Sequence, residues 1–312
     1  MNTEFEIYWG IDVSKAWIDI AVENKVIRID QTDEAIREFI DKHKAENKKI
    51  LAVLESTGGY EKRAADCLSE ASITVHIAHP NKVKSFAKAR GRLAKTDKID
   101  AAILKDYGSF IKLEEIRELP SKMQYQLQLF GARLAQLKDL HHQESCRRGI
   151  ASEEMIENSI DVMLEIIKKQ MEAVKENILA IIKSNAELKD TYEILCSMKG
   201  VGPALAMVLI TDLPELGRAN KKEIAALVGV APITSQSGIK TGKAITRYGR
   251  SSIRKILYMG ALTACRYNEK LKLFYKKLRD AGKPAKVAIV AVMRKMIVIL
   301  NAMIASKSHF LA

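Results

Sequence analysis

The sequence predicts a mixed α/β domain at the N-terminus, followed by a chain that is almost entirely helical. Residues 1–115 contain short, β-rich apolar runs separated by segments with helical spacing. Beyond residue 116, apolar residues recur every three or four positions over long stretches. The length of 312 residues suits about two domains, and a hydrophobic content of 47% is ample for cored globular domains.

The order of the N-terminal elements is informative about the fold. We predict strands at 6–13, 17–22 and 25–29, a helix at 32–44, a strand at 50–55, a helix at 60–71, a strand at 73–78 and a helix at 97–110. Gly58-Gly59 follows one of these strands, and Pro80 ends another. Three early strands followed by alternating helices and strands indicate a mixed sheet. This order matches the ribonuclease-H-like layout.

The rest of the chain is predicted to be helical. Apolar residues step by threes and fours over 160–181 and, with similar spacing, over 127–140, with a turn at Arg147-Arg148-Gly149. These two arms predict either a helical hairpin that spaces two domains or a dimerising coiled coil, because both bury the same stripe. The last segment reads as helices with tight breaks. The predicted domains are therefore 1–115, 116–190 and 191–312.

The net charge of +13, from 51 basic and 38 acidic residues, is concentrated in the last third of the chain. Residues 1–115 hold 19 Lys and Arg against 20 Asp and Glu, and residues 116–195 hold 11 against 13. Residues 196–312 hold 21 against 5, a net charge of +16. A folded domain with that charge repels itself unless it binds a polyanion. Nucleic acid is the first candidate for this polyanion, and an anionic membrane surface is the second. The alternative is that the charge only keeps the domain soluble.

No feature predicts secretion, a disulfide framework or a membrane span. The first ten residues are acidic and lack the apolar core of a secretory signal. Cys67, Cys146, Cys196 and Cys265 form no CxxC pair, so we expect reduced thiols in a cytoplasmic protein. The most apolar run, 285–304, contains central charges that favour a buried helix over a membrane span. We therefore expect no membrane partner.

Four carboxylates are candidates for one metal site. Asp12 follows the apolar run of the first strand, and Glu55 closes the strand 50–55. A charge in such a run is costly unless it is paired, and a metal ion would supply the partner. Asp97 and Asp100 are three positions apart at the start of a helix, so they share one face. Hard oxygen ligands suit Mg²⁺ or Mn²⁺, and two such ions clamp the attacking and leaving oxygens of a phosphodiester.

Each of these carboxylates also has an ordinary structural role open to it. Asp12 could cap the turn before Ser14, and Glu55 could pair with a lysine. Asp97 could be a helix N-cap, with Asp100 at the third helical position. Taken singly, these roles are the more common ones. The joint placement of the four residues on a ribonuclease-H-like order of elements favours the metal site instead.

Two segments are rich in cations. The segment 82–98 contains seven basic residues and one acid, Asp97, and leads directly into the predicted metal site. The segment 224–268 contains seven basic residues and no acid. Both are expected to contact nucleic acid, although a run of charges is commonly only a solvated face. The residues predicted to make these contacts are Lys82, Lys84, Lys88, Arg90, Arg92, Lys95, Lys240, Lys243, Arg247, Arg250, Arg254 and Lys255.

Two short motifs in the last segment suggest further contacts and chemistry. The run 198–203 (MKGVGP) stands between two helical segments and resembles a helix-hairpin-helix, in which Gly200 and Gly202 would let backbone N–H groups approach a phosphate. A purely structural helix turn is the alternative. The run 234–238 (TSQSG) offers a serine that could attack a phosphodiester if arginines or metal ions activate it. A serine in a loop is more often only a turn residue.

Taken together, the motifs resemble a known family over nearly the full length of the chain. They are Gly10-Ile11-Asp12-Val13-Ser14-Lys15, Glu55-Ser56-Thr57-Gly58-Gly59-Tyr60, Lys95-Thr96-Asp97-Lys98-Ile99-Asp100-Ala101, Gly200-Val201-Gly202-Pro203, Gly229-Val230-Ala231-Pro232, Ser237-Gly238 and the run 249–258. The chain resembles the insertion-sequence 110 family of transposases, including its 1111 subgroup. The resemblance implies a RuvC-like Asp-Glu-Asp-Asp domain followed by a serine-bearing transposase domain.

The resemblance also implies residue roles and partners. The Mg²⁺ ligands would be Asp12, Glu55, Asp97 and Asp100. Ser237 would form a covalent serine–DNA phosphate intermediate, in a composite active site shared between protomers of a homo-oligomer, a dimer or tetramer. A structured non-coding guide RNA would pair with double-stranded donor and target DNA. The stretch after the Gly-Val-Ala-Pro motif reads ITSQSG, so the preference for Ser237 over Ser235 rests on its adjacency to Gly238.

Three other functions are open to this sequence. A Mg²⁺-dependent nuclease that resolves Holliday-type junctions would use the same carboxylates but would hydrolyse with water, without a covalent adduct. An actin-like sugar kinase would suit the phosphate-loop character of GIDVS and ESTGG, but it leaves the charge of +16 unexplained. A non-catalytic helix-hairpin-helix binding protein would keep its function in an Asp12→Asn variant.

Overall fold

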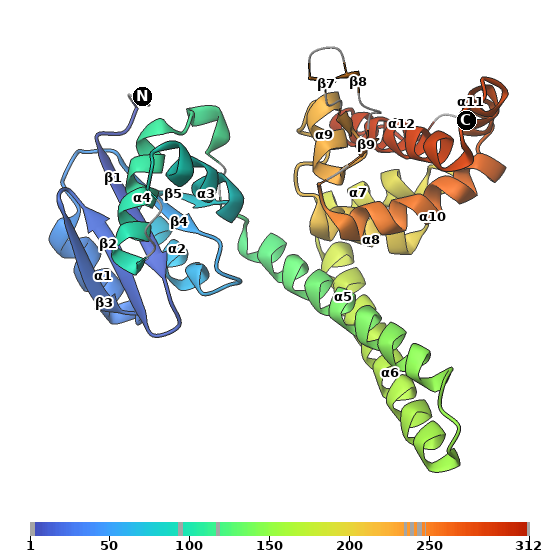
Figure 1. The fold of residues 1–312 in the computed structure, drawn as a ribbon, viewed down its shortest axis with the longest axis horizontal. Helices are drawn as coiled ribbons and strands as arrows, with labels where there is room; N and C mark the ends of the chain where they lie inside the picture. The colour runs from blue at the N-terminus through green and yellow to red at the C-terminus, as the bar shows by residue number, and fades with distance from the viewer. Residues whose placement is uncertain are drawn as a thin grey trace. The chain divides into compact units, whose positions relative to one another are not determined.

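A sheet-containing unit and a helical unit, Met1–Pro120 and Ser121–Ala312, make up the computed structural model (Figure 1). The structure describes residues 4–92, 96–116, 119–233, 236–237, 240–241, 245–246 and 248–310. The first unit is a mixed α/β sheet and the second is mostly helical, as predicted. The finer division into three domains stays a prediction.

The sheet of the first unit has five strands in the order β3-β2-β1-β4-β5. Their bounds are β1 Ile7–Val13, β2 Trp17–Val22, β3 Lys25–Asp30, β4 Ile50–Glu55 and β5 Thr74–Ala78. On one side of β1, β2 and β3 form an antiparallel meander, whereas β4 and β5 run parallel to β1 on the other side. The strand predictions are confirmed, with boundaries that shift by no more than one residue.

Helices cover both faces of this sheet. They are α1 (Asp33–His43), α2 (Glu61–Glu70), α3 (Pro80–Ala89) and α4 (Asp97–Phe110), followed by the short 3₁₀ turn η1 (Leu113–Glu115). Because side chains alternate along a strand, Trp9 and Ile11 point into the core formed with α1 and α2. Leu51 and Val53 point the opposite way, into the core formed with α3 and α4.

Helix α3 was not predicted, because Pro80 indicates the end of a strand. In the structure, Pro80 lies in the first turn of α3, and the His79 ring accepts a hydrogen bond from the backbone N–H of Asn81. Proline suits this position because an N–H there would have no partner within the helix. The residue that stops the strand pattern therefore also starts the next helix.

Glycines set how closely α4 approaches the sheet. A Cβ atom on Gly10 of β1 would lie 2.0 Å from the backbone oxygen of Ala101 and 2.2 Å from the backbone nitrogen of Lys105. A Cβ atom on Gly108 of α4 would lie 2.9 Å from the side chain of Val53 on β4. Backbone-to-backbone packing of this kind excludes any larger residue at position 10. It holds α4 across β1 and β4.

The second unit begins with a hairpin of two long helices, α5 (Lys122–Arg148) and α6 (Glu154–Ser184), which lie side by side (Figure 1). Gly149 caps α5, at the end of the predicted turn. The apolar stripes along the hairpin are partly buried. Their most buried members are Leu127, Leu134, Leu137, Ile167, Ile178 and Ile182.

Six shorter helices pack around one core in the rest of this unit. They are α7 (Ala186–Cys196), α8 (Pro203–Asp212), α9 (Lys221–Val228), α10 (Ser251–Tyr267), α11 (Glu269–Asp280) and α12 (Ala285–Ala305). By length and composition α12 could cross a membrane, yet half of its most apolar window is buried within the unit. Ile289, Val292 and Met296 are among its core residues, as expected for a buried helix.

Candidate carboxylate site and serine segment

Strand register places four charged residues in one row across the sheet. Asp12 of β1 is opposite Asp19 of β2, and Asp19 is opposite Arg28 of β3. The parallel register of β1 and β4 puts Asp12 next to Glu55. Asp12 is two residues from Gly10, so it lies on the face against which α4 packs. The row Glu55, Asp12, Asp19, Arg28 therefore lies on the α4 side of the sheet.

The first turn of α4 adds the other two predicted carboxylates. Thr96 is the N-cap of this helix, and its side-chain oxygen accepts a hydrogen bond from the backbone N–H of Ile99. The capping role that was open to Asp97 is thus performed by Thr96. Asp97 and Asp100 both lie in the first turn, which the close contact at Gly10 holds over the sheet.

Asp12 faces other acids and does not serve as a turn cap. Ser14 closes the turn between β1 and β2, because its hydroxyl donates to the backbone oxygen of Trp17 and accepts from the backbone N–H of Trp17. Burial, as the largest cause, and nearby negative charges raise the pKa of the Asp12 carboxyl to about 6. The charges responsible, from the largest effect to the smallest, are Asp100, Asp97, Glu55 and Asp19. The four predicted carboxylates are therefore within electrostatic reach of one another.

An arginine that sequence reasoning missed lies beside this cluster. The Arg28 Nε and Nη2 atoms donate to the two carboxylate oxygens of Asp19 at 3.0 and 2.6 Å. Nη2 also donates to Asp97 at 3.2 Å. The Asp19 side chain is only 1% exposed, so the guanidinium supplies the partner that a buried charge requires. The alternation of residues 17–30 could have indicated this pair, but only once the register of the hairpin was known.

The chemistry of this donor set fits a divalent cation. Carboxylate oxygens are the ligands that Mg²⁺ and Mn²⁺ prefer, and a cation would offset both the burial of the Asp12 charge and its repulsion by the other carboxylates, which together raise its pKa. As the side chains stand, no three His, Cys, Asp or Glu residues in the described part of the chain are close enough to hold an ion. Binding would therefore draw the carboxylates together, and Asp97 would turn from Arg28.

The loop after Glu55 is organised around a carboxylate of its own. Glu61 is buried, and its side chain accepts hydrogen bonds from the backbone N–H groups of Thr57 and Gly59 and from the Thr57 hydroxyl. Burial alone would raise the pKa of Glu61, but these hydrogen bonds outweigh it and lower the pKa. Because the amides of the ESTGG motif bind Glu61, they are not arranged as a phosphate loop. This counts against the sugar-kinase interpretation.

The predicted serine lies on a two-level β hairpin that was not expected. Its four short strands are β6 (Pro232–Ile233), β7 (Gln236–Ser237), β8 (Lys240–Thr241) and β9 (Ile245–Thr246). β6 pairs with β9, and further out β7 pairs with β8, with Ser237 opposite Lys240. Strands of two residues leave no periodicity for a sequence to reveal. The predicted residues Ser235, Gly238, Lys243 and Arg247 lie outside the described residues.

The base of this hairpin is closed by a contact between two glycines. Gly229 ends α9 in the left-handed conformation, and a Cβ atom there would lie 2.1 Å from the backbone oxygen of Tyr248. A Cβ atom on Gly249 would lie 2.3 Å from the backbone nitrogen of Gly229. The backbone N–H of Arg250 donates to the Leu227 oxygen at 2.8 Å. The two ends of the segment 230–248 are thus held together.

Two predicted nucleic-acid residues take part in that closure. The Arg250 guanidinium makes two hydrogen bonds with Glu215, at 2.6 and 2.7 Å. The Arg254 side chain donates to the backbone oxygen of Tyr248. Both side chains therefore have structural partners at the base of the hairpin. Lys255, on the same helix, is exposed.

Similarity to known proteins gives this arrangement its context. Residues 9–147 match the DEDD-type transposases of the IS110 group, and residues 192–276 match the Transposase IS116/IS110/IS902 family. The first match contains Asp12, Glu55, Asp97 and Asp100, and the second contains Ser237. The chain belongs to the IS110 family of transposases. As a member of that family it is a DNA transposase, and its DEDD domain implies a ribonuclease-H-like fold, in agreement with the observed sheet.

Two similar proteins match most of the length of this transposase, and a third matches part of it. The pilin gene-inverting protein of Moraxella lacunata is 27% identical over 288 residues, which cover 87% of this chain and 85% of that protein. Its counterpart in Moraxella bovis is 26% identical over 285 residues, with the same coverage. An uncharacterized 44.8 kDa protein of insertion element IS116 from Streptomyces clavuligerus is 30% identical over 142 residues, 45% of this chain and 35% of that protein.

The predicted cationic residues of the transposase's first unit differ in their surroundings. Lys82 contacts Glu115 at 2.7 Å, and Arg92 contacts Asp106 at 3.1 Å. Arg90 lies over the ring of Phe110, with 5.1 Å from its Cζ atom to the ring centroid. The exposed residues of this group with no ion pair in the described ranges are Lys84 and Lys88. Lys95 lies outside the described residues.

The two glycines of the GVGP motif differ in their surroundings. A Cβ atom on Gly200 would lie 2.6 Å from the side chain of Ala264 on α10, so this glycine is needed for helix packing. Gly202 is the N-cap of α8, and a Cβ atom there would have no neighbour within 4 Å. Of the two glycines, Gly202 is the exposed one, and its contact with a phosphate stays a prediction. The Lys240 side chain is not among the described ones.

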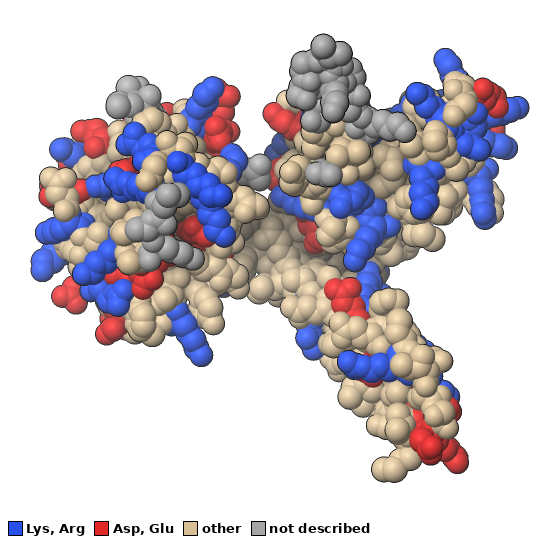
Figure 2. Space-filling model, in the orientation of Figure 1, with Lys and Arg blue, Asp and Glu red and all other residues tan. Residues whose placement is uncertain are grey.

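A cationic surface on α11 was also missed by sequence reasoning. Lys and Arg side chains gather over α11 (Figure 2). The exposed ones are Arg266, Lys270, Lys272, Lys276, Lys277, Arg279, Lys283 and Lys286. The stretch without acids ends at Asn268, because Glu269 and Asp280 are the first and last residues of α11. A criterion that requires a stretch without acids excludes α11, although the cations of this helix are exposed together on its surface.

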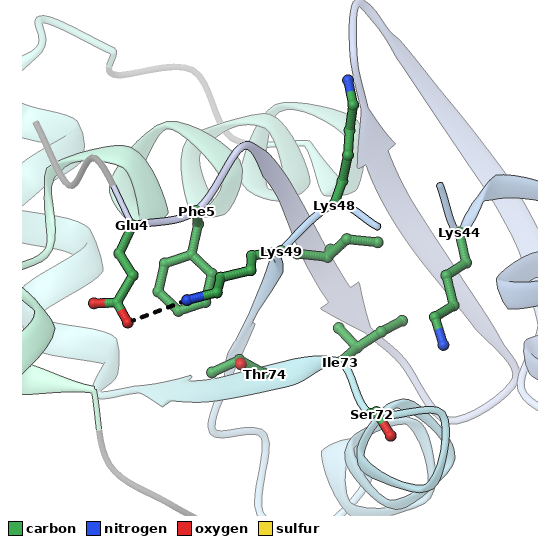
Figure 3. Close-up of a pocket in the computed structure, with 9 residues that line it drawn as sticks. Glu4, Phe5, Lys44, Lys48, Lys49, Ser72, Ile73 and Thr74 are labelled. Carbon is green, nitrogen blue, oxygen red and sulfur yellow. Dashed lines mark ion pairs between the residues drawn. The ribbon is translucent and has the colours of Figure 1, made fainter. Parts of the chain in front are cut away.

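Figure 3 shows a pocket in the first unit. It has a volume of about 260 Å³ and is lined by residues that include Lys44, Lys48 and Lys49. Ile50 and Thr74, at the starts of β4 and β5, also line it, whereas Glu55 is at the other end of β4. None of the predicted site residues contributes to this pocket.

Proposed function

We propose that this transposase cuts and rejoins DNA strands at a Mg²⁺-dependent carboxylate site, through a covalent intermediate on Ser237. The observation that carries the proposal is the placement of Asp12, Glu55 and the first turn of α4 on one face of the sheet. Burial, and then the charges of the neighbouring carboxylates, raise the pKa of Asp12 to about 6 there. Like charges are kept together at a cost in stability, and a functional site is the usual reason. The match to DEDD-type transposases supports the same assignment.

In this proposal the carboxylates and the serine perform separate tasks. Asp12, Glu55, Asp97 and Asp100 would hold Mg²⁺ or Mn²⁺, which when bound supplies charge stabilisation for the phosphodiester. The Ser237 oxygen forms a bond to phosphorus as the bond from phosphorus to the leaving sugar oxygen breaks. The serine loses a proton and the leaving hydroxyl gains one. The phosphoester linkage is conserved, so attack by another strand's hydroxyl can rejoin the DNA.

The clamp at the base of the hairpin supports a positioning role for the serine segment. A hydroxyl is a weak nucleophile near neutral pH and gains most from accurate placement. The Gly229–Gly249 contact and the Arg250–Glu215 ion pair fix where the hairpin leaves the helical core. The composite active site, in which the carboxylates of one protomer meet the serine of another, is part of this proposal.

The partners in this proposal follow from charge and from the family resemblance. The net charge of +16 on residues 196–312, and the cations exposed around α11, support binding of nucleic acid by the second unit. We infer that a structured guide RNA binds there and pairs with donor and target DNA. The α5–α6 hairpin would act as a coiled coil in a dimer or tetramer, and the turn at Gly202 as a helix-hairpin-helix. The setting would be the bacterial or archaeal cytoplasm.

One alternative has a specific observation in its favour. All four carboxylates belong to the first unit, and a RuvC-like nuclease needs no serine from elsewhere. Such an enzyme would cut Holliday-type junctions by Mg²⁺-dependent hydrolysis. It would leave the serine segment and its clamp without a catalytic purpose.

A covalent adduct separates the two functions. Purified protein is incubated with nicked DNA substrate and Mg²⁺, and the products are separated under denaturing conditions. We expect a protein–DNA adduct with the wild-type protein and with Ser235→Ala, and none with Ser237→Ala or Asp12→Asn. Cleavage by Ser237→Ala at the wild-type rate would establish the hydrolytic alternative. An adduct in Ser237→Ala that is lost in Ser235→Ala would move the nucleophile to Ser235.

A further inference from the structure

An exposed tryptophan lies beside the carboxylate row. Trp17 is the first residue of β2, two residues before Asp19, and therefore on the same face of the sheet as that buried carboxylate. Trp17 is 39% exposed, whereas Trp9 is only 1% exposed within the core. The partly exposed Trp17 ring is a flat apolar surface beside charged groups, which is the kind of surface on which another aromatic ring can stack.

Arg28 joins this tryptophan to the carboxylates. Its Cζ atom lies 4.8 Å from the centroid of the Trp17 ring, a cation–π distance. Its Nε and Nη2 atoms are engaged by Asp19 and Asp97, whereas Nη1 donates no hydrogen bond within the described residues. The two N–H groups on Nη1 therefore remain available, and the side chain is 46% exposed. Arg28 thus places the Trp17 ring and two available N–H donors side by side.

We propose that Trp17 and Arg28 hold an unpaired nucleotide of the DNA strand at the carboxylate site. The base packs against the exposed surface of the Trp17–Arg28 pair, and Nη1 of Arg28 donates to an adjacent phosphate oxygen. This inference rests on the proposed function, since the strand is the one to be cut there. A base inside a duplex is stacked on both faces, so only an unpaired base can use such a surface.

The surrounding charge adds a condition to this contact. Arg28 is already balanced by Asp19 and Asp97, and Asp12, Glu55 and Asp100 add further negative charge nearby. A phosphate approaching this face is repelled until divalent cations neutralise the carboxylates. When Asp97 turns toward a cation, Nη2 of Arg28 gains a free N–H for the phosphate. The nucleotide contact therefore depends on a divalent cation.

The two tryptophans of the chain allow a direct test, because Trp17 is exposed and Trp9 is buried. Ser237→Ala protein, which forms no adduct in the proposed mechanism, is titrated with a short oligothymidylate in Ca²⁺ or in EDTA while tryptophan emission is recorded. We expect quenching in Ca²⁺ and little in EDTA. The same titration of Ser237→Ala carrying Trp17→Phe should show no change in the emission from Trp9.

Affinity measurements sharpen the same test. In Ca²⁺, Trp17→Ala should weaken binding of the single strand to this site about tenfold, the low end of what one base–aromatic stack contributes, and Trp17→Phe should retain most of it. Arg28→Lys keeps the charge but loses the fork of donors, so it should weaken the same binding and leave Asp19 paired. The affinity of each variant for the oligonucleotide is measured by fluorescence anisotropy and compared with that of the protein that keeps Trp17 and Arg28.

Several results would overturn this inference. Equal quenching by duplex DNA would remove the requirement for an unpaired base. Quenching by oligouridylate but not by oligothymidylate would assign the surface to RNA. Quenching that is the same in Ca²⁺ and EDTA, or absent altogether, would make the Trp17–Arg28 pair a structural feature of the hairpin. A wild-type adduct without quenching refutes only this inference, and quenching without any adduct refutes only the serine mechanism.

Discussion

The carboxylate row and the serine segment are held in place by different means. The carboxylates stand on central strands and on a helix that touches β1 backbone to backbone at Gly10. The serine is on strands of two residues, and its position depends on a glycine contact and an ion pair at the base of the hairpin. The first group is placed by the core of a domain, and the second by a clamp at a loop. A substitution that displaces the carboxylates should therefore lower the stability of the first unit, whereas one that disturbs the clamp should mainly lower the yield of the adduct.

The largest expected effect is at Gly10. A side chain there would have to displace α4, because the backbone of that helix lies closer than any Cβ contact allows. We expect Gly10→Val to lower the free energy of unfolding by more than about 3 kcal/mol, the upper end of ordinary overpacking costs, and to abolish cleavage. Thermal unfolding by circular dichroism measures the change.

Gly202→Ala is the matched control for that substitution, because a Cβ atom at position 202 meets nothing within 4 Å. Its melting temperature should stay close to that of the wild-type protein. A Gly10→Val protein that melts and cleaves like the wild type would show that α4 does not hold the carboxylates as described.

A smaller effect is expected at the clamp. Gly249→Ala introduces a clash with Gly229, whereas Gly282→Ala introduces the same left-handed strain with no neighbour within 4 Å. Both should lose about 1 kcal/mol of stability from backbone strain, and Gly249→Ala should lose more because its Cβ atom also meets the backbone of Gly229. Only Gly249→Ala should lower the yield of the covalent adduct, by about tenfold or more, because the serine is displaced. Equal adduct yields in the two variants would separate the clamp from the chemistry.

The smallest expected effect is on stability: keeping the Asp12 charge among the other carboxylates makes the metal-free protein less stable. The pKa of Asp12 is 3.8 in the unfolded chain and about 6 in the folded protein, so ionisation of Asp12 favours unfolding. Without metal, Asp12→Asn should stabilise the protein by on the order of 1 kcal/mol at neutral pH. The gain should be absent below the unfolded pKa and should grow as pH rises to the folded pKa. Melting temperatures of both proteins in EDTA across that range test this; an Asp12→Asn protein that is no more stable at neutral pH contradicts it.

The sequence was sufficient for those parts of the site that depend on local patterns. Apolar runs that end near Asp12 and Glu55 indicated both the strands and their carboxylates, and the first turn of α4 was readable at 97–100. The cap of that helix was not, because Thr96 and not Asp97 is the N-cap. The Asp19–Arg28 pair was not readable, since it depends on the register between β2 and β3. The periodic elements and the residues within them were predictable, and their cross-strand partners were not.

The second unit shows where charge counting misleads. Arg250 was assigned to nucleic acid because no acid is near it in the sequence, yet it pairs with Glu215, 35 residues earlier. The cations of α11 were not predicted to bind nucleic acid, because that helix begins and ends with the acids Glu269 and Asp280. The strands of the serine hairpin are too short for any periodicity. Pairing between segments that are apart in the sequence, which decides the cases of Arg250 and of the serine hairpin, is a property of the fold.

Binding of Mn²⁺, followed by the electron paramagnetic resonance of the free ion, tests most directly whether the four acids form one metal site. The wild-type protein and Asp106→Asn, whose acid on α4 pairs with Arg92, should bind Mn²⁺ equally well. Asp12→Asn and Asp100→Asn should each bind much more weakly. Undiminished Mn²⁺ binding by both of these variants would show that the carboxylates on β1, β4 and α4 do not act together.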